Sequence, residues 1–297
     1  MDQSYKRNFI RAGAIAKEVR AYGKSLIVPG ASYNAVINQI NAKIHELGAR
    51  PAFPPQIAMN DVAAHYLPYP DEDIIFSVEV VKLDVGVCFQ GAIGDCAVSI
   101  DLSGQHQKLI EAAEAALLAA EKSIKVGQPL REVGRIIDET ARSYGLKPIQ
   151  NLSGHGLGVY KIHTPPMIPN YDNRSKVEIK PGMTFAIEPF VTDGAGLIYE
   201  VDEPTIFAFV KNQPLRTDNA KKLLTRIKEF AGLPFAIHDL ISAEMPLDKV
   251  RKGLGELLKT ETITGYGPLL EKDRGMVAQA ENSVLVDDDG TVIITTR

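Results

Sequence analysis

The sequence is poor in cysteine, carries little net charge, and contains no long apolar run. Its two cysteines, Cys88 and Cys96, are too few for a disulfide scaffold, so a reducing cytoplasm is the simplest setting. No stretch approaches the ~20 apolar residues of a membrane-spanning helix, and the first residues lack the apolar run of a signal peptide. A formal net charge of −4 gives no sign of a nucleic-acid or anionic-membrane partner.

What is present is the composition of a soluble globular protein, with 45% hydrophobic and 24% charged residues. The 297 residues suffice for one large domain, or for one domain with an insertion. Apolar periodicity, N-cap residues and terminal glycines indicate four helices, and β-rich runs around turn residues indicate strands. We expect helices at about 5–22, between Ser32 and Gly48, over 107–127 and over 130–145, and strands in a hairpin at 82–100, at 183–191, at 198–210 and in a second hairpin at 283–296.

The stretch from about 211 to 265 has a helical pattern, although strands are expected on both sides of it. Pro234 and Pro246 would divide it into three short helices. This pattern predicts an α+β domain built from residues 1–210 and 266–297, with a helical insertion subdomain at about 211–265.

Two aspartates lie within the apolar hairpin KLDVGVCFQGAIGDCAVSI, residues 82–100. Aspartate is a poor strand former, and a buried carboxylate is costly unless it is paired. If the turn centres on Phe89-Gln90-Gly91, Asp84 and Asp95 fall nearly opposite each other, with Cβ atoms about 5 Å apart. Two solvated carboxylates on an exposed face are the simpler alternative. A cation between the two would remove their repulsion, as in two-metal sites.

Four further polar residues lie in or beside apolar, strand-like segments. The Gly-rich segment NLSGHGLGVYKIH holds His155 and His163, two of only six histidines in the chain. Glu188 follows an apolar strand, and Glu281 lies between Val277 and Val284. Each alone could be a structural histidine or a strand-edge charge. Together with the two aspartates, His155, Glu188 and Glu281 offer four carboxylates and one imidazole, which suits Mn²⁺, Fe²⁺, Co²⁺ or Zn²⁺ and the hydrolysis of an amide, ester or phosphoester.

The order Asp, Asp, His, Glu, Glu resembles that of the methionine aminopeptidases, in particular the type 2 enzymes of archaea and eukaryotes. The matching stretches are PAFPPQIAMNDVAAHY (51–66), KLDVGVCFQGAIGD (82–95), NLSGHGLGVYKIH (151–163), FAIEPF (185–190) and VAQAENSVLV (277–286). They span nearly the whole chain. The resemblance implies the α+β pita-bread fold, in which helices cover a curved antiparallel sheet, with a helical insertion.

The resemblance also implies a metal centre with two divalent ions (Co, Mn, Fe, Zn or Ni). Its ligands would be Asp84, Asp95, His155, Glu188 and Glu281. Asp95 and Glu281 match the bridging pair of the family, and Glu188 matches the ligand given the general-base role. The implied activity is removal of the N-terminal methionine from nascent proteins, with a small second residue preferred, by a metal-activated water that attacks the first peptide bond.

Five positions match substrate-contacting residues of the family. His65 and His163 match the two histidines that contact the substrate amide and the tetrahedral intermediate, so both are expected to be catalytic. Phe53, Ile162 and Tyr266 match walls of the methionine pocket, more loosely.

Two features place the chain within the family. Glu188 and Glu281 are 93 residues apart (281 − 188), a separation that the insertion explains and that type 1 enzymes lack. The family usually has histidine after the last metal-binding glutamate, whereas this chain has Asn282. Because neighbours on a strand point to opposite faces, Asn282 should face away from the metals, and we expect activity to be retained.

Two other functions are compatible with this kind of chain. Prolidase-type dipeptidases share the fold and ligand order, but usually carry a sizeable N-terminal domain before the first ligand. Relatives that have lost metal ligands act as RNA- or protein-binding factors, yet all five ligands are present here, and ten Lys+Arg against seven Asp+Glu in 211–265 is only mildly basic. We expect a cytoplasmic monomer acting on nascent N-termini, which allows association with the ribosome, without membrane or nucleic-acid partners.

Overall fold

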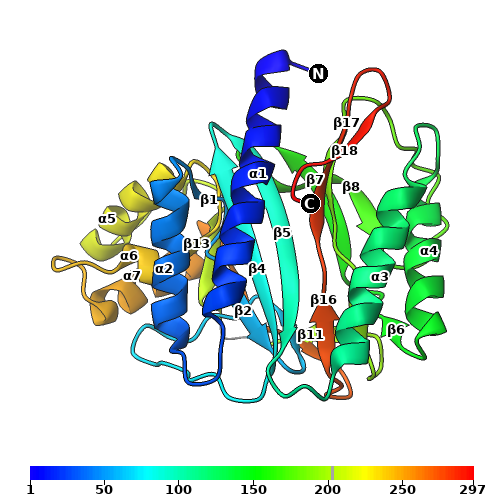
Figure 1. Ribbon diagram of the computed structural model, residues 1–297. Helices are drawn as coiled ribbons and strands as arrows, with labels where there is room; N and C mark the ends of the chain where they lie inside the picture. The colour runs from blue at the N-terminus through cyan, green and yellow to red at the C-terminus, as the bar shows by residue number, and fades with distance from the viewer. Residues whose placement is uncertain (202–203) are drawn as a thin grey trace.

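The computed structural model describes residues 1–201 and 204–297, and its helices form two pairs and one smaller group (Figure 1). The helices are α1 (Gln3–Leu26), α2 (Tyr33–Glu46), α3 (Gln107–Ser123), α4 (Leu130–Ser143), α5 (Asp218–Ile227), α6 (Ile237–Leu240) and α7 (Leu247–Lys259), with a 3₁₀ turn η1 (Lys228–Phe230). The four helices expected in the first half of the chain are therefore confirmed. Within the described residues, none of the helices combines the length and apolar character needed to cross a membrane.

The strands form five sheets in which all described pairings are antiparallel. The first sheet holds β1 (Arg50–Pro51), β2 (Gln56–Met59), β4 (Val80–Phe89) and β5 (Ala92–Asp101); the second holds β7 (Ser153–Gly158), β8 (Lys161–Pro169), β9 (Thr184–Ile187), β17 (Asn282–Val286) and β18 (Val292–Ile294). Three smaller sheets join β6 (Lys147–Pro148), β10 (Phe190–Thr192) and β16 (Val277–Gln279); β3 (Val62–Ala64), β11 (Ile198–Glu200) and β15 (Leu269–Glu271); and β12 (Ile206–Phe209), β13 (Phe235–Ala236) and β14 (Ile263–Tyr266).

The helix pairs cover the sheets from one side. In Figure 1, α1 stands in front of β4 and β5 with α2 to its left, while α3 and α4 stand to the right of the central β16 and β17. One buried apolar cluster joins α1 and α2 to β4, and another joins α3 and α4 to β9 and β17. This layering confirms the α+β architecture expected from the sequence and leaves the opposite face of the strands for the polar residues.

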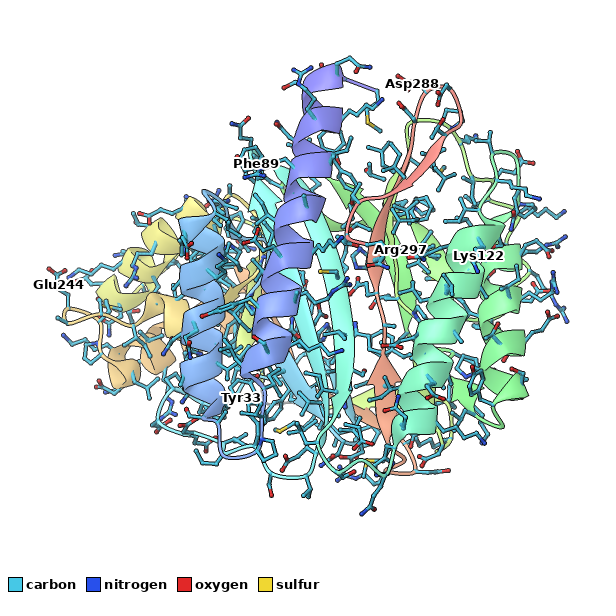
Figure 2. All side chains as sticks on the ribbon, viewed as in Figure 1. Tyr33, Phe89, Lys122, Glu244, Asp288 and Arg297 are labelled. Atoms are coloured by element: carbon cyan, nitrogen blue, oxygen red, sulfur yellow. The ribbon has the colours of Figure 1, made fainter. Side chains whose placement is uncertain are left out.

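Tyr33 fixes the first helix pair to the strands beneath it. It begins α2, is fully buried, and is marked in Figure 2 at the lower end of that helix. Its hydroxyl accepts a hydrogen bond from the Ile57 amide (3.0 Å) and donates one to the Tyr66 carbonyl (2.9 Å). One side chain therefore clamps β2 and the residues that follow β3.

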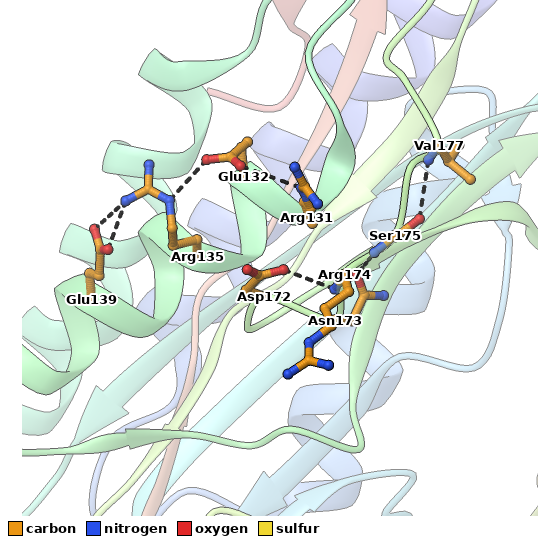
Figure 3. A network of polar contacts seen from close by, with 9 residues as sticks. All are labelled: Arg131, Glu132, Arg135, Glu139, Asp172, Asn173, Arg174, Ser175 and Val177. Atoms are coloured by element: carbon orange, nitrogen blue, oxygen red, sulfur yellow. Dashed lines mark hydrogen bonds and ion pairs between the residues drawn. The ribbon is translucent and has the colours of Figure 1, made fainter.

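Ion pairs between side chains one turn apart run along the exposed face of α4 (Figure 3). Arg135 contacts Glu132 at 2.9 Å and Glu139 at 2.7 Å, one turn away on either side. Such pairs contribute only a few tenths of a kcal/mol each, about 0.3–0.5.

The turn of the first hairpin lies slightly later than expected. Phe89 pairs with Ala92, so the turn consists of Gln90 and Gly91, which both have positive φ (49° and 87°). Two left-handed residues are what a type I′ turn requires, and its twist matches that of the strands. The pattern of apolar residues cannot show this, because glutamine is an uncommon residue at a left-handed position.

This register makes the two hairpin aspartates diagonal neighbours rather than directly opposed residues, which corrects the expected pairing. Asp84 pairs with Ala97, and Asp95 pairs with Gly86. The offset is two residues, so both carboxylates still point to the same face of the sheet.

Other expected strands are present but interrupted. The run at 183–191 forms β9 and β10, with Glu188 and Pro189 between them, since proline cannot donate to a ladder. The run at 198–210 contains β11 and β12, and its positions 202–203 lie outside the described residues. The C-terminal hairpin is confirmed as β17 and β18, with its turn after Val286.

The predicted insertion contains α5, η1, β13, α6 and α7, which surround an apolar cluster of their own. Its last residues enter β14, which pairs with β12. The 3₁₀ turn ends at Ala231 and Gly232, which both have left-handed backbone conformations, and α6 begins only after Pro234. The boundaries of the insertion as a subdomain stay a prediction.

Candidate metal centre and catalytic cavity

A cavity of about 500 Å³ opens on the face of the strands opposite the helix pairs, and all ten residues singled out from the sequence line it. They are Phe53, His65, Asp84, Asp95, His155, Ile162, His163, Glu188, Tyr266 and Glu281. They come from both large sheets and from the segments near β3 and β14. Residues that are up to 228 positions apart (281 − 53) therefore meet in one place.

Polar groups gather at one end of this cavity. One ligand atom each from Asp95, His155 and Glu281 lies within 4.8 Å of the other two. The His155 Nε2 atom lies 3.4 Å from Glu188 Oε1 and 3.7 Å from Asp95 Oδ2. Asp95 and Glu281 are almost completely buried, at 2% and 1% exposure.

Burial and mutual repulsion disfavour the charged forms of these carboxylates. Burial raises the pKa of Asp84 to about 7. Burial, followed by the neighbouring carboxylates, raises the pKa of Asp95, Glu188 and Glu281 well above the usual range. Burial lowers the pKa of His155 to about 3, so its imidazole is neutral and available as a ligand.

The residues present fit divalent cations. Asp84 Oδ1 and Asp95 Oδ1 are buried and have no hydrogen-bond partner among the described residues. Buried oxygens of this kind need a partner, and four carboxylates with one neutral imidazole form an oxygen-rich donor set with one nitrogen. Metal ligation would satisfy the oxygens and offset the negative charge.

The backbones that carry these ligands are held from behind. Ser283 Oγ accepts from the Asp95 amide (2.8 Å) and donates to the Asp95 carbonyl (2.9 Å), which joins β5 to β17. Arg20 of α1 donates to the Glu281 carbonyl at 2.9 Å. These contacts fix the backbones of Asp95 and Glu281 relative to each other.

Asn282 takes no part in lining the cavity, in agreement with strand alternation. Its side-chain oxygen accepts from Arg20 (3.0 Å) and Thr296 (2.8 Å), and its amide donates to the buried Glu121 at 2.7 Å. The residue therefore belongs to a polar cluster behind the strand, and every hydrogen-bonding atom of its side chain has a partner.

Two further histidines lie along the cavity. The His65 ring contacts the Tyr266 ring edge-on, with centroids 5.6 Å apart, and the His163 ring lies 4.4 Å from that of His155. Burial lowers the pKa of His65 to about 4, so its imidazole is neutral at pH 7. A neutral imidazole carries one N–H that can donate a hydrogen bond.

Apolar side chains form the remainder of the wall. Phe53 and Ile162 are each 7% exposed and pack in one cluster. The Phe53 ring lies directly over Gly86 of β4, where a Cβ atom would come within 2.1 Å of the ring. Gly86 is therefore glycine because the aromatic wall requires that space.

We expect Gly86→Ala to lower kcat/KM by at least about tenfold for any substrate whose apolar side chain enters this part of the cavity, because the added methyl displaces Phe53 toward the cavity. The thermal midpoint should fall as well, since overpacking costs about 1–3 kcal/mol. Steady-state kinetics and a thermal melt measure both effects. Unchanged kinetics in a folded variant would show that Phe53 does not shape the pocket.

Comparison with known proteins agrees with this geometry. A family model described as metallopeptidase family M24 matches residues 7–287. The chain belongs to metallopeptidase family M24. Relatives include methionine aminopeptidases of Methanocaldococcus jannaschii, 40% identical over 288 residues (96% of this chain, 97% of that protein), and of Pyrococcus abyssi, 40% identical over 289 residues (96% and 98%).

Solved structures share the M24 fold at low sequence identity. A methionine aminopeptidase from Thermotoga maritima superposes with a TM-score of 0.72 at 22% identity, covering 100% of this chain and 98% of that one. A thermophilic Arx1 gives 0.85 at 14% identity (99% and 91%), and a prolidase from Pyrococcus furiosus gives 0.62 at 17% (100% and 64%). These matches confirm the pita-bread fold, and the archaeal relatives confirm the family resemblance.

Several residues of the cavity carry no signal in the sequence and were not predicted. Gln56, Asn151 and Met167 line the cavity, as do apolar residues from other strands. Gln56 directly precedes the apolar run of β2 and has no charge, so nothing in its local pattern distinguishes it from a surface glutamine. Only the pairing of Gln56 with Asp84 across β2 and β4 reveals its place.

Proposed function

We propose that this protein is a metal-dependent methionine aminopeptidase that removes the N-terminal methionine from nascent polypeptides. The main support for the proposal is that the four acidic residues and the one histidine of the matched ligand order all line one cavity, beside an apolar pocket. Relatives that are 34–40% identical over nearly their full length and are named methionine aminopeptidases support the same activity.

Five residues would hold the metals. They are Asp84, Asp95, His155, Glu188 and Glu281. When bound, divalent cations supply polarisation of the scissile carbonyl and activation of a water nucleophile.

Glu188 would accept the proton that the attacking water loses. Its carboxylate follows β9 at a break in the strand and keeps 12% of its side-chain surface exposed, unlike the fully buried Glu281. That position gives it access to both the nucleophile and the leaving amine. We assign it the role of general base, which passes the proton to the amine as the peptide bond breaks.

His65 and His163 stabilise the transition state. The neutral His65 imidazole lies in the cavity wall beside Tyr266, and His163 adjoins His155. N–H donors held in place before the reaction can stabilise the negative charge that develops on the carbonyl oxygen, often the largest catalytic contribution.

Recognition of the first residue is assigned to the apolar part of the cavity. Phe53, Ile162 and Tyr266 would surround the methionine side chain. Its burial contributes roughly 2 kcal/mol. The remainder of the substrate would leave through the open side of the cavity.

The proposed setting is the cytoplasm, where a monomer would meet nascent chains as they leave the ribosome. Two cysteines, both buried and unpaired, agree with a reducing compartment.

The proposal is tested by stripping metal from the purified protein, adding Co²⁺ or Mn²⁺, and measuring methionine release from Met-Ala-Ser. Metal-dependent release is expected, with Met-Lys-Ser and Gly-Pro cleaved far more slowly. Preferential cleavage of Gly-Pro would instead identify a prolidase-type dipeptidase. No release with any metal, from protein shown to bind that metal, would contradict the proposed activity.

His65→Ala is expected to lower kcat by about 10²–10³-fold, because one donor to the developing oxyanion is lost. Metal content, measured by elemental analysis, should stay that of the wild type, since His65 is not among the proposed ligands. Loss of metal in this variant would show that the assigned role is wrong.

A further inference from the structure

The backbone of His65 adopts a conformation that this residue seldom takes. Its φ is +59°, in the left-handed region, where a side chain with a Cβ atom is disfavoured. His65 directly follows β3, so the sheet ladder does not impose this conformation. A specific contact is needed to hold the residue there, and strained backbone of this kind is concentrated at functional sites.

That contact comes from Gln56. The Gln56 side-chain oxygen accepts a hydrogen bond from the His65 backbone N–H at 2.8 Å. Gln56 is only 6% exposed and lines the catalytic cavity. Within residues 1–201 and 204–297, its side-chain N–H₂ group donates no hydrogen bond, so the contact to His65 is the one the side chain makes.

Gln56 also lies beside the proposed metal centre. It pairs with Asp84 across β2 and β4, and opposed residues of an antiparallel pair share one face of the sheet. Gln56 is therefore a neighbour of Asp84, a proposed metal ligand, on one face of the sheet, and a hydrogen-bond partner of His65, the proposed oxyanion donor.

The surrounding backbone is held independently of Gln56. The Tyr33 hydroxyl binds the amide of Ile57 and the carbonyl of Tyr66, the residues that follow Gln56 and His65. The general path of the chain is thus secured by Tyr33. The Gln56 contact is left to fix the orientation of one peptide group and, through it, the direction of the His65 imidazole.

We propose that Gln56 is a positioning residue that holds the His65 imidazole in its catalytic direction. This inference rests on the proposed function, because it assumes that His65 acts on the substrate. It adds a residue that neither its type nor its neighbours in the sequence would single out.

The test is a double-mutant cycle with Gln56→Met, which keeps the length of the side chain but removes the acceptor. Gln56→Met alone should lower kcat for Met-Ala-Ser by roughly 100-fold with KM changed less than about twofold, since a small misplacement of a catalytic group has this effect. In the His65→Ala background the same substitution should change kcat by less than about twofold, because its target is gone. An equal loss of kcat in both backgrounds would overturn the proposal.

Tyr33→Phe serves as the structural control, since it loosens the same segment without touching the Gln56 contact. It should lower the thermal midpoint more than Gln56→Met does, and kcat less. If Gln56→Met fails to fold, amide hydrogen exchange of the wild type tests the hydrogen bond from the His65 N–H to Gln56. The His65 N–H should be protected, and rapid exchange would contradict the contact. An inactive wild type would count against the proposed function and leave this exchange measurement interpretable.

Discussion

Glu281→Gln will reduce methionine release from Met-Ala-Ser by about 10³-fold or more. Glu281 is 1% exposed, and its carboxylate lies within 4.8 Å of ligand atoms of both Asp95 and His155. A carboxamide of the same shape is a weak ligand and removes one of the four negative charges that balance the cations. Loss of several kcal/mol of metal-assisted stabilisation corresponds to this factor. Steady-state kinetics with saturating Mn²⁺ or Co²⁺ measure it, and elemental analysis should show reduced metal content.

The matched control is Glu139→Gln on α4, which removes a negative charge from an exposed ion pair with Arg135 (Figure 3). Its kcat/KM should remain within about twofold of the wild type, and its stability within about 0.5 kcal/mol. A Glu281→Gln variant that keeps full activity and full metal content would remove Glu281 from the centre. Equal losses in both variants would indicate a nonspecific effect of charge.

Metal-free protein will become less stable as pH rises from about 6.5 to 8.5. The four buried carboxylates have pKa values raised by burial, to about 7 for Asp84 and well above the usual range for the others. In the unfolded chain the same groups are ionised above pH 5. The folded state therefore binds more protons than the unfolded state in this window, so the free energy of unfolding falls as pH rises.

The histidines act in the opposite sense, but at lower pH. Burial lowers the pKa of His65 to about 4 and of His155 to about 3, whereas the unfolded value is about 6.5. Their contribution to stability rises with pH and is nearly complete about one pH unit above 6.5, where both imidazoles are neutral in the folded and the unfolded state. Above about pH 7.5 only the carboxylates contribute, so the fall in stability is clearest in the upper half of the window.

Raising the pKa of Asp84 from 3.8 to about 7 corresponds to about 4 kcal/mol over its whole titration, but most of this stability is lost below pH 6.5. Asp84 alone therefore lowers the free energy of unfolding by about 1 kcal/mol across the window, and the three carboxylates whose pKa is raised further add to this fall. For a chain of this length each 1 kcal/mol corresponds to a fall in thermal midpoint of roughly 2 °C. Calorimetry of metal-free protein across the pH window measures the change, and saturating Mn²⁺ should abolish it, since bound cations replace the protons.

Asp95→Asn provides a second arm of this experiment. Removing one charge from the cluster relieves the remaining three carboxylates of repulsion, so the metal-free variant should be more stable than the metal-free wild type at pH 8.5. The same variant should bind metal weakly. If the thermal midpoint of the metal-free wild type stays constant or rises over this pH window, burial does not raise the pKa values of the four carboxylates as described.

The residues of the proposed metal centre could be selected from the sequence because each is a local anomaly. Asp84, Asp95, Glu188 and Glu281 interrupt apolar strands where a carboxylate is costly, and such a position needs a reason. The long helices were predictable on similar grounds, because apolar periodicity and capping residues are local features. The fold and the ligand order then agreed with one family.

Other features depend on contacts that no local pattern contains. The hairpin register was predicted wrongly because it follows from Gln90 in a left-handed conformation, which residue type alone does not suggest. The break between β9 and β10 depends on Pro189, and Gln56 resembles any strand-start glutamine until its partner His65 is seen. Cross-strand pairing and backbone strain are properties of the folded chain.

The most direct test of the central claim is an anomalous diffraction measurement on crystals soaked in Mn²⁺. We expect anomalous density in the cavity, surrounded by the side chains of Asp84, Asp95, His155, Glu188 and Glu281 and weakened in Glu281→Gln crystals. Active protein whose Mn²⁺ lies elsewhere, or whose Asp84 and Asp95 side chains point to opposite faces of the hairpin, would contradict it.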